Sequence, residues 1–170
     1  MNKKRKNDFK HSIEVGLSFG LTSGVITALG LMVGVYSSTS STVAVLASLL
    51  TIAIADAMSD ALGIHISEEN ENIHTSAEIW VATLTTFMAK FIISLSFVVA
   101  LFIFPIKTAV LVNIAWGSFL MVAYNYWVGE KQEENTWSVI IEHLVIAFVV
   151  IAITYFVGQW LNPWLTSLNF

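Results

Sequence analysis

The chain has 170 residues, of which 56% are hydrophobic and only 12% charged, and its formal net charge is -4. A soluble domain carries about 25% charged residues, so the composition excludes an ordinary water-soluble domain, and it argues against a nucleic-acid partner. A membrane-spanning helix needs roughly 20 apolar residues, which leaves room for about five spans and for no second domain. The absence of cysteine excludes disulfides, thiolate metal sites and cysteine nucleophiles.

Five apolar segments follow one another, and we predict that each forms a transmembrane helix within a single domain of residues 1–170. The predicted helices cover residues 13–36, 43–66, 77–104, 108–128 and 137–161. Pro105 separates the third from the fourth, and Pro163 is expected to stop the fifth, because proline lacks a backbone N–H and clashes with the preceding turn. The predicted fold is therefore all-α and polytopic.

The basic residues indicate the orientation of the chain in the membrane. Five of the eight precede the first apolar segment, namely Lys3, Lys4, Arg5, Lys6 and Lys10. Because cytosolic connections are enriched in Lys and Arg, we place the N-terminus and Lys131 in the cytosol and Lys107 alone outside. Five spans then put the C-terminus outside. We expect an integral membrane protein, in the plasma membrane if the chain is prokaryotic.

The first apolar segment carries glycines at four-residue spacing in two runs. They are Gly16, Gly20, Gly24, Gly30 and Gly34. Small residues allow helix backbones to approach closely in lipid. One such pair is a weak signal, but three in one helix predict a packing face, which we call the glycine ridge. Its partner is either another helix of the chain or a second copy, and the pattern alone does not decide between them.

Asp56 and Asp60 lie inside the second segment, where an ionised side chain costs about 2.5–3.5 kcal/mol. Their spacing of one helical turn places both carboxylates on one face, roughly 15 Å and 9 Å below the cytosolic surface when counted back from Ile66. Two such carboxylates repel each other and favour sharing a proton until a metal ion displaces it. The pair therefore predicts cation or proton transport; the alternative is a structural role, with the aspartates bonded to serines or paired with a lysine.

Lys90 is the candidate for that structural pairing, because its position in the third segment places it at nearly the depth of Asp56. An ion pair between Lys90 and Asp56 would neutralise both and leave Asp60 as the free carboxylate. Lys90 is then either a counter-ion, which we favour, or the group that an entering cation must displace.

Two further acidic residues, Glu14 and Glu142, enter the membrane at the cytosolic end, and His143 follows Glu142. With Asp60 they would form a vestibule in which the carboxylates supply hard oxygen ligands to a divalent ion and the imidazole supplies a ligand or a proton acceptor. The alternative is that these side chains reach out to the aqueous interface, and for Glu14 we favour it.

The connection after the second segment is acidic and is flanked by His65 and His74. Its carboxylates, which would capture cations electrostatically, are those of Glu68, Glu69, Glu71 and Glu78. The alternative for such a run of charges is that it is simply solvated.

Two stretches resemble the vacuolar iron transporter family. The run FGLTSGVITALGLMVG, Phe19 to Gly34, resembles the first-helix signature of that family, and SDALGIHIS, Ser59 to Ser67, resembles its second-helix pattern Ser-Met-x-x-Gly-Glu-Tyr-x-Ser. The resemblance implies a five-helix membrane protein that dimerises, with its first helices lining the path, and that exchanges ferrous or manganous ions for protons.

The chain departs from the family at the metal ligands. The first-helix aspartate of the family falls on Ser23 here, and the second-helix methionine falls on Asp60. The resemblance thus implies a rearranged ligand set of Asp60 and Asp56, with Ser23 and Thr27 as neutral partners along the pathway. Such an all-oxygen set would accept manganese, calcium or magnesium more readily. The larger cytosolic metal-binding insertion of the family is absent.

Three functions are compatible with the sequence, which contains no nucleotide-binding glycine loop, serine–histidine–acid set or HExxH motif. We expect no enzymatic activity and no permanently bound cofactor. The leading hypothesis is a homodimeric secondary transporter that moves a divalent metal ion, of the iron or manganese class, out of the cytosol in exchange for protons. The second is a non-transporting scaffold or accessory subunit, favoured if Lys90 contacts both aspartates and the glycine ridge is closed without a polar cavity. A proton or small-cation channel is the third.

Overall fold

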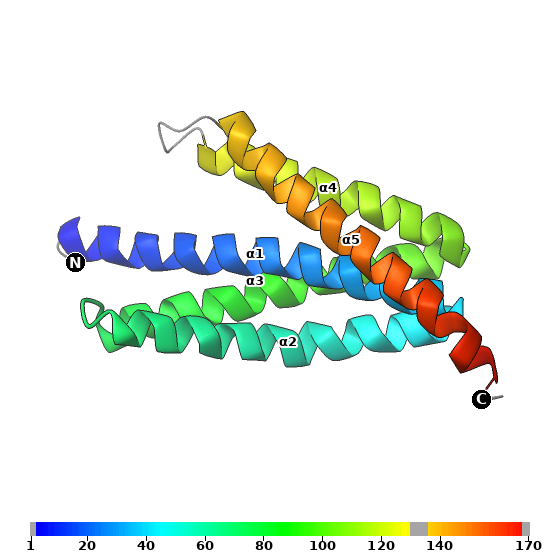
Figure 1. The fold of residues 1–170 in the computed structure, drawn as a ribbon. Coiled ribbons are helices and arrows are strands. Elements are labelled where there is room, and N and C mark those ends of the chain that lie inside the picture. Colours follow the sequence, from blue (N-terminus) through cyan, green and yellow to red (C-terminus); the bar gives the residue numbers. More distant parts are fainter. Residues whose placement is uncertain (1–2, 130–135, 168–170) are drawn as a thin grey trace.

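The structure, a computed structural model, describes residues 3–129 and 136–167, with side chains from residue 8 onward. It consists of five helices, α1 Lys3–Thr39, α2 Thr42–Asn70, α3 Ser76–Ile103, α4 Ile106–Gly129 and α5 Thr136–Ser167 (Figure 1). Each contains a segment long and apolar enough to cross a membrane, and no strand occurs in the described ranges. The prediction of an all-helical protein with five spans is confirmed.

The helix bounds differ from the predicted ones mainly at the two ends of the chain. Helix α1 begins ahead of the apolar run, although the side chains of residues 3–7 and the whole of Lys131, on which the predicted orientation rests, lie outside the described part. The prediction that Pro163 stops the last helix is wrong, because α5 continues through it to Ser167. Only one turn follows the proline, so few backbone hydrogen bonds are lost. The Asn162 side chain also donates to the Ser38 carbonyl at 2.7 Å, which fixes this end of α5 to α1.

Helix α1 is the centre of the bundle and packs against each of the other four helices. Helices α1, α2 and α3 run side by side, while α5 crosses α1 obliquely and α4 packs against α1, α3 and α5 (Figure 1). The start of α1 and the end of α5 lie at opposite ends of the bundle, as an odd number of spans requires (Figure 1).

The glycines of α1 allow these close contacts inside the chain. A Cβ atom added at Gly16 would lie 2.6 Å from the Ala82 carbonyl oxygen of α3, and one at Gly20 would lie 2.7 Å from that of Thr86. Further along, a Cβ at Gly30 would lie 2.8 Å from the Val150 side chain of α5. Both runs of the ridge are therefore in contact with helices of the same chain, the first with α3 and the second with α5.

Many large apolar side chains are exposed on the surface of the bundle, as the membrane requires. Helix α2 buries one small-residue stripe, which includes Ala53, Ala57 and Ala61, and it exposes Met58 and Leu62 on another face. Helix α5 is the least buried, with three buried residues. The helices thus meet through narrow contacts and leave broad faces for lipid.

Candidate functional site

Four polar side chains from three helices meet where α1, α2 and α3 run side by side. The Lys90 ammonium lies 2.6 Å from Asp56 Oδ2, and it also contacts Asp60 Oδ2. It donates to Ser23 Oγ at 2.9 Å, and the Ser23 hydroxyl donates to Asp60 Oδ2 at 2.6 Å. We call these four residues the acid–lysine cluster.

The predicted pair between Lys90 and Asp56 is present, but the expectation that Asp60 stays free is wrong. The four-residue spacing of the aspartates places both carboxylates beside the same ammonium, so one lysine reaches both. The depth of Lys90 in the membrane could be matched from the sequence with only one aspartate, Asp56. Its contact with both aspartates depends on how α2 is rotated about its axis relative to α3.

Small residues bring the three backbones close enough for these contacts. The buried alanines of α2, among them Ala57, lie next to the aspartates in sequence and have no exposed surface or almost none. On the other side, a Cβ added at Gly24 of α1 would lie 3.4 Å from the Cα of Lys90. Helix α1 therefore approaches α3 at the level of the lysine, which places Ser23 within reach of its ammonium.

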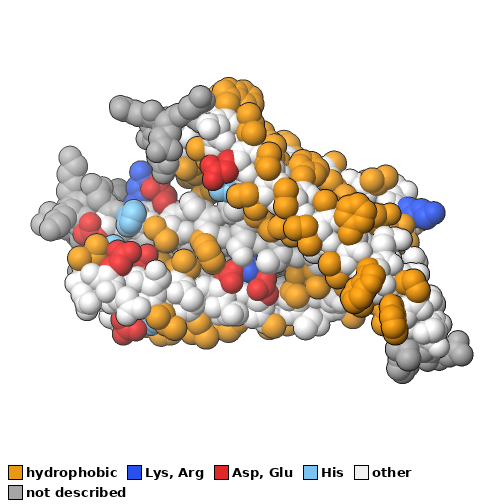
Figure 2. All heavy atoms as spheres, in the orientation of Figure 1, with side chains coloured by type: hydrophobic (Ala, Val, Ile, Leu, Met, Phe, Trp, Pro, Cys, Tyr) orange, Lys and Arg blue, Asp and Glu red, His pale blue; other side chains and the backbone are white. Residues whose placement is uncertain are grey.

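Burial within the cluster is unequal. The Lys90 side chain is 1% exposed, whereas those of Asp56 and Asp60 are 31% and 21% exposed. Figure 2 shows acidic and basic side chains together near the middle of this face, far from both ends of the molecule. The ammonium is enclosed by protein, while each carboxylate also faces the surface of the bundle.

A groove of about 420 Å³ lies beside Asp56, between α1, α2 and α5. Thr27 and Gly30 line its α1 side, and Thr154 lines its α5 side. The Thr27 hydroxyl donates to the Ser23 carbonyl at 2.8 Å, so its oxygen keeps lone pairs for another partner. This groove gives a small ligand access to Asp56 from the side of the bundle.

The charges of the cluster do not balance when every group is ionised. Two carboxylates face one ammonium, and no second Lys or Arg among the described residues pairs with either aspartate. The cluster then carries one net negative charge at a depth where uncompensated charge is costly. One additional positive charge, a proton or a monovalent cation, would neutralise it, and a divalent ion would leave it with one net positive charge.

The predicted vestibule is not formed. Among the described residues no group of three or more His, Asp and Glu side chains is placed to hold a metal ion. His143 Nδ1 lies 2.8 Å from the Val139 carbonyl of its own helix, and Glu142 is exposed. Glu14 lies 3.7 Å from Lys10 on the surface of α1, which agrees with the interfacial alternative.

The acidic connection divides into structural and solvated groups. Glu78 is buried because its carboxylate accepts from the Thr75 amide at 2.8 Å, in a capping box that starts α3. Glu68 is also buried, and its carboxylate lies 3.5 Å from His74 Nε2. His74 is equally 3.5 Å from Glu71, which is half exposed, and Glu69 is exposed. Three of the four predicted cation-capturing carboxylates thus have local contacts, and two of these three are buried.

The sequence analysis did not predict the capping box of Glu78 or the contacts of His65. The spacing Thr75-x-x-Glu78 is the pattern of a capping box, so a signal for the role of Glu78 was present. His65, which lies 2.9 Å from the Thr83 hydroxyl and edge-on to Trp80, gave no such signal, because its partners belong to the next helix.

Comparison with protein-family models, with curated proteins and with solved structures finds no match for the chain. Its function therefore has to be argued from its own residues and their geometry. The acid–lysine cluster is the part of the described structure that combines intramembrane charge with access through a groove on the side of the bundle.

Proposed function

We propose that the protein is a secondary transporter that moves a divalent metal ion, of the iron or manganese class, out of the cytosol in exchange for protons. The observation that carries this proposal is the acid–lysine cluster, in which two partly exposed carboxylates share one buried ammonium. Asp60 and Asp56 are the proposed carriers of both the metal ion and the proton.

The charge balance of the cluster favours exchange over a leak. Protons and metal ions compete for the same carboxylate oxygens, so the binding of one releases the other. A cluster that holds neither keeps a net negative charge within the membrane, which is costly. The cluster without a proton or a metal ion is therefore the disfavoured state. An exchanger needs this property, because a carrier that changes sides while empty would uncouple the two ions.

The oxygen atoms around the cluster suit a hard divalent ion. Asp56 and Asp60 supply carboxylates, the Ser23 hydroxyl is bonded to Asp60, and Thr27 lines the groove beside Asp56. Such a set accepts manganese, calcium and magnesium as well as ferrous ion. The resemblance of the first two helices to the vacuolar iron transporter family supports the iron and manganese class. For the ion to bind, Lys90 must withdraw from at least one carboxylate.

We also propose that the transporter is a homodimer in which the face carrying Ser23 and Thr27 meets its equivalent. The carboxylates are partly exposed on this face, and lipid would solvate them poorly. The α1 glycines already contact α3 and α5, so the dimer would use the remaining face of α1. This arrangement agrees with the role of the first helix that the resemblance implies.

Transport by reconstituted protein tests the proposal. The full chain is placed in liposomes, and manganese or iron uptake driven by a pH gradient is measured. We expect uptake by the wild type, none above empty vesicles for Asp60→Asn, and wild-type uptake for the matched control Asp8→Asn, which lies outside the cluster. A wild-type protein that moves no divalent ion would refute the proposal.

A non-transporting scaffold is the second candidate, and two observations favour it. Lys90 contacts both aspartates, and the glycine ridge is closed by α3 and α5. Against it, the groove leaves Asp56 accessible beside the hydroxyl of Thr27. A scaffold would show no uptake in the same liposomes, and Asp60→Asn would change only its thermal stability. Uptake that dissipates a gradient but never accumulates ion against one would instead indicate a channel.

A further inference from the structure

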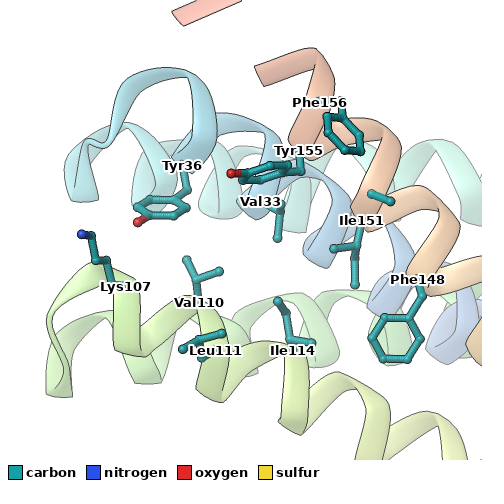
Figure 3. A pocket seen from close by; sticks show the side chains of 11 residues that line it. Val33, Tyr36, Lys107, Val110, Leu111, Ile114, Phe148, Ile151, Tyr155 and Phe156 are labelled. Carbon is teal, nitrogen blue, oxygen red and sulfur yellow. The ribbon is translucent and has the colours of Figure 1, made fainter. Parts of the chain in front are cut away.

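A second groove, of about 560 Å³, lies between α1, α4 and α5 (Figure 3). Pockets of about 300–1,000 Å³ are typical of small-molecule sites. The groove is lined almost entirely by apolar side chains, among which are Val110, Ile114 and Ile151. It shares no lining residue with the groove beside Asp56, so it is a separate feature of the bundle.

The polar groups of this groove are gathered at one end. Figure 3 shows Lys107 beside the hydroxyl of Tyr36, and the hydroxyl of Tyr155 points toward the same end. Ile114 and Ile151 lie farther along, where the groove offers only hydrocarbon. The groove therefore has a cationic, hydroxyl-bearing mouth and an apolar body.

The charge of Lys107 has no counterpart in the described residues. The end of the bundle opposite the start of α1 contains no Asp or Glu in the connections after α1 and α3 or in the last turns of α5. No carboxylate among the described side chains forms an ion pair with Lys107. Lys107 also stands in the first turn of α4, where the helix dipole adds positive potential. An anion is the complementary partner for this mouth.

We propose that the groove binds an anionic phospholipid, with one acyl chain along its apolar body and the phosphate at Lys107 and the two tyrosine hydroxyls. A phospholipid joins these two chemistries in one molecule, and the bilayer presents it directly to a groove on the lipid-facing side of the bundle. Lysine is an effective point-charge partner for phosphate, and tyrosines favour the headgroup level. A free phosphate would use the mouth and leave the apolar body unfilled.

Lipid retention by the purified full chain tests this proposal. The protein in detergent is titrated with phosphatidylglycerol or phosphatidylcholine of identical acyl chains, and bound lipids are counted by native mass spectrometry. We expect phosphatidylglycerol to bind about five-fold more tightly, the effect of one lysine near an anionic headgroup. Lys107→Gln should remove this preference, whereas Lys10→Gln, the same change on an exposed lysine near the start of α1, should preserve it.

A second variant tests the apolar body of the groove independently of its cationic end. Ala152→Phe places a large side chain in the apolar body, and it should weaken the binding of both lipids while leaving Lys107 in place. Because Ala152 and Lys107 are both exposed, neither change disturbs the core. An unchanged preference in Lys107→Gln would overturn the proposal, as would full lipid binding in Ala152→Phe. Displacement of the lipid by glycerol phosphate at equal concentration would overturn it too, since it would identify a site for soluble phosphate.

Discussion

Acidic side chains meet a basic one in the middle of α2 and again at its end, and the two arrangements differ. In the middle of the helix, the basic side chain of Lys90 is buried, while Asp56 and Asp60 are partly exposed. At the end of the helix, His74 lies between a buried Glu68 and an exposed Glu71. Water at a helix end can solvate a carboxylate whose partner moves away, but lipid cannot. The central acids therefore need a counter-ion built into the fold, whereas the exposed Glu71 does not.

The largest expected effect comes from removing that counter-ion. Lys90→Met leaves two carboxylates without a cationic partner, and we expect it to lower the free energy of unfolding by about 3–5 kcal/mol. Thermal unfolding in detergent measures the loss. The double variant Lys90→Met, Asp56→Asn should recover a large part of it, because one uncompensated charge is removed. Equal stability of Lys90→Met and the wild type would show that the cluster is not held by this ion pair.

The second prediction concerns the helix contact that supports the cluster. A Cβ at Gly20 would lie 2.7 Å from a backbone oxygen of α3, so Gly20→Ala must push α1 and α3 apart. We expect a loss of about 1–3 kcal/mol in unfolding free energy. Gly63→Ala is the matched control, since no atom lies within 4 Å of the added Cβ, and it should be neutral or stabilising. Equal effects of the two changes would contradict the packing described for α1.

A smaller effect is expected at Ser23, which joins α1 to the cluster. Ser23→Ala removes the hydrogen bond to Asp60 and the acceptor for Lys90, while the ion pairs remain. We expect a loss of about 1 kcal/mol, the usual contribution of a hydrogen bond. Unfolding measured in parallel for Thr27→Val, whose hydroxyl does not contact the aspartates, provides the comparison. A loss as large as that of Lys90→Met would mean that Ser23, rather than the charge balance, holds the site together.

The smallest effect is expected at the end of α2. Glu71 is 52% exposed where it approaches His74, so Glu71→Gln should change the unfolding free energy by less than about 1 kcal/mol. Salt should reduce even this difference, because exposed charges are screened. A loss comparable to that of Lys90→Met, or one insensitive to salt, would remove the contrast between the two regions.

The fold could be predicted from the sequence because each span is a long apolar segment bounded by polar residues. The shared face of Asp56 and Asp60 also follows from their spacing alone. What the sequence could not supply is the rotation of one helix relative to another. The contact of Lys90 with Asp60 as well as Asp56, and the place of Ser23 between them, depend on that rotation.

Predictions based on single residues were less successful than those based on segments. Pro163 was expected to end α5, but a proline one turn from a helix end disturbs few hydrogen bonds. Glu142 and His143 were grouped with Asp60 because they enter the membrane at the cytosolic end, but α5 packs mainly on α1 and α4. A shared end of the membrane does not by itself bring side chains of different helices together.

The position of Lys90 also bears on how the chain enters the membrane during synthesis. Helix α2 carries both aspartates and no Lys or Arg, so its insertion alone would strand two acids in hydrocarbon. The neutralising lysine lies on the next helix, after a connection of residues 71–75. We therefore expect α2 and α3 to insert together as a helical hairpin, with their ion pairs formed before α4 and α5 have been made.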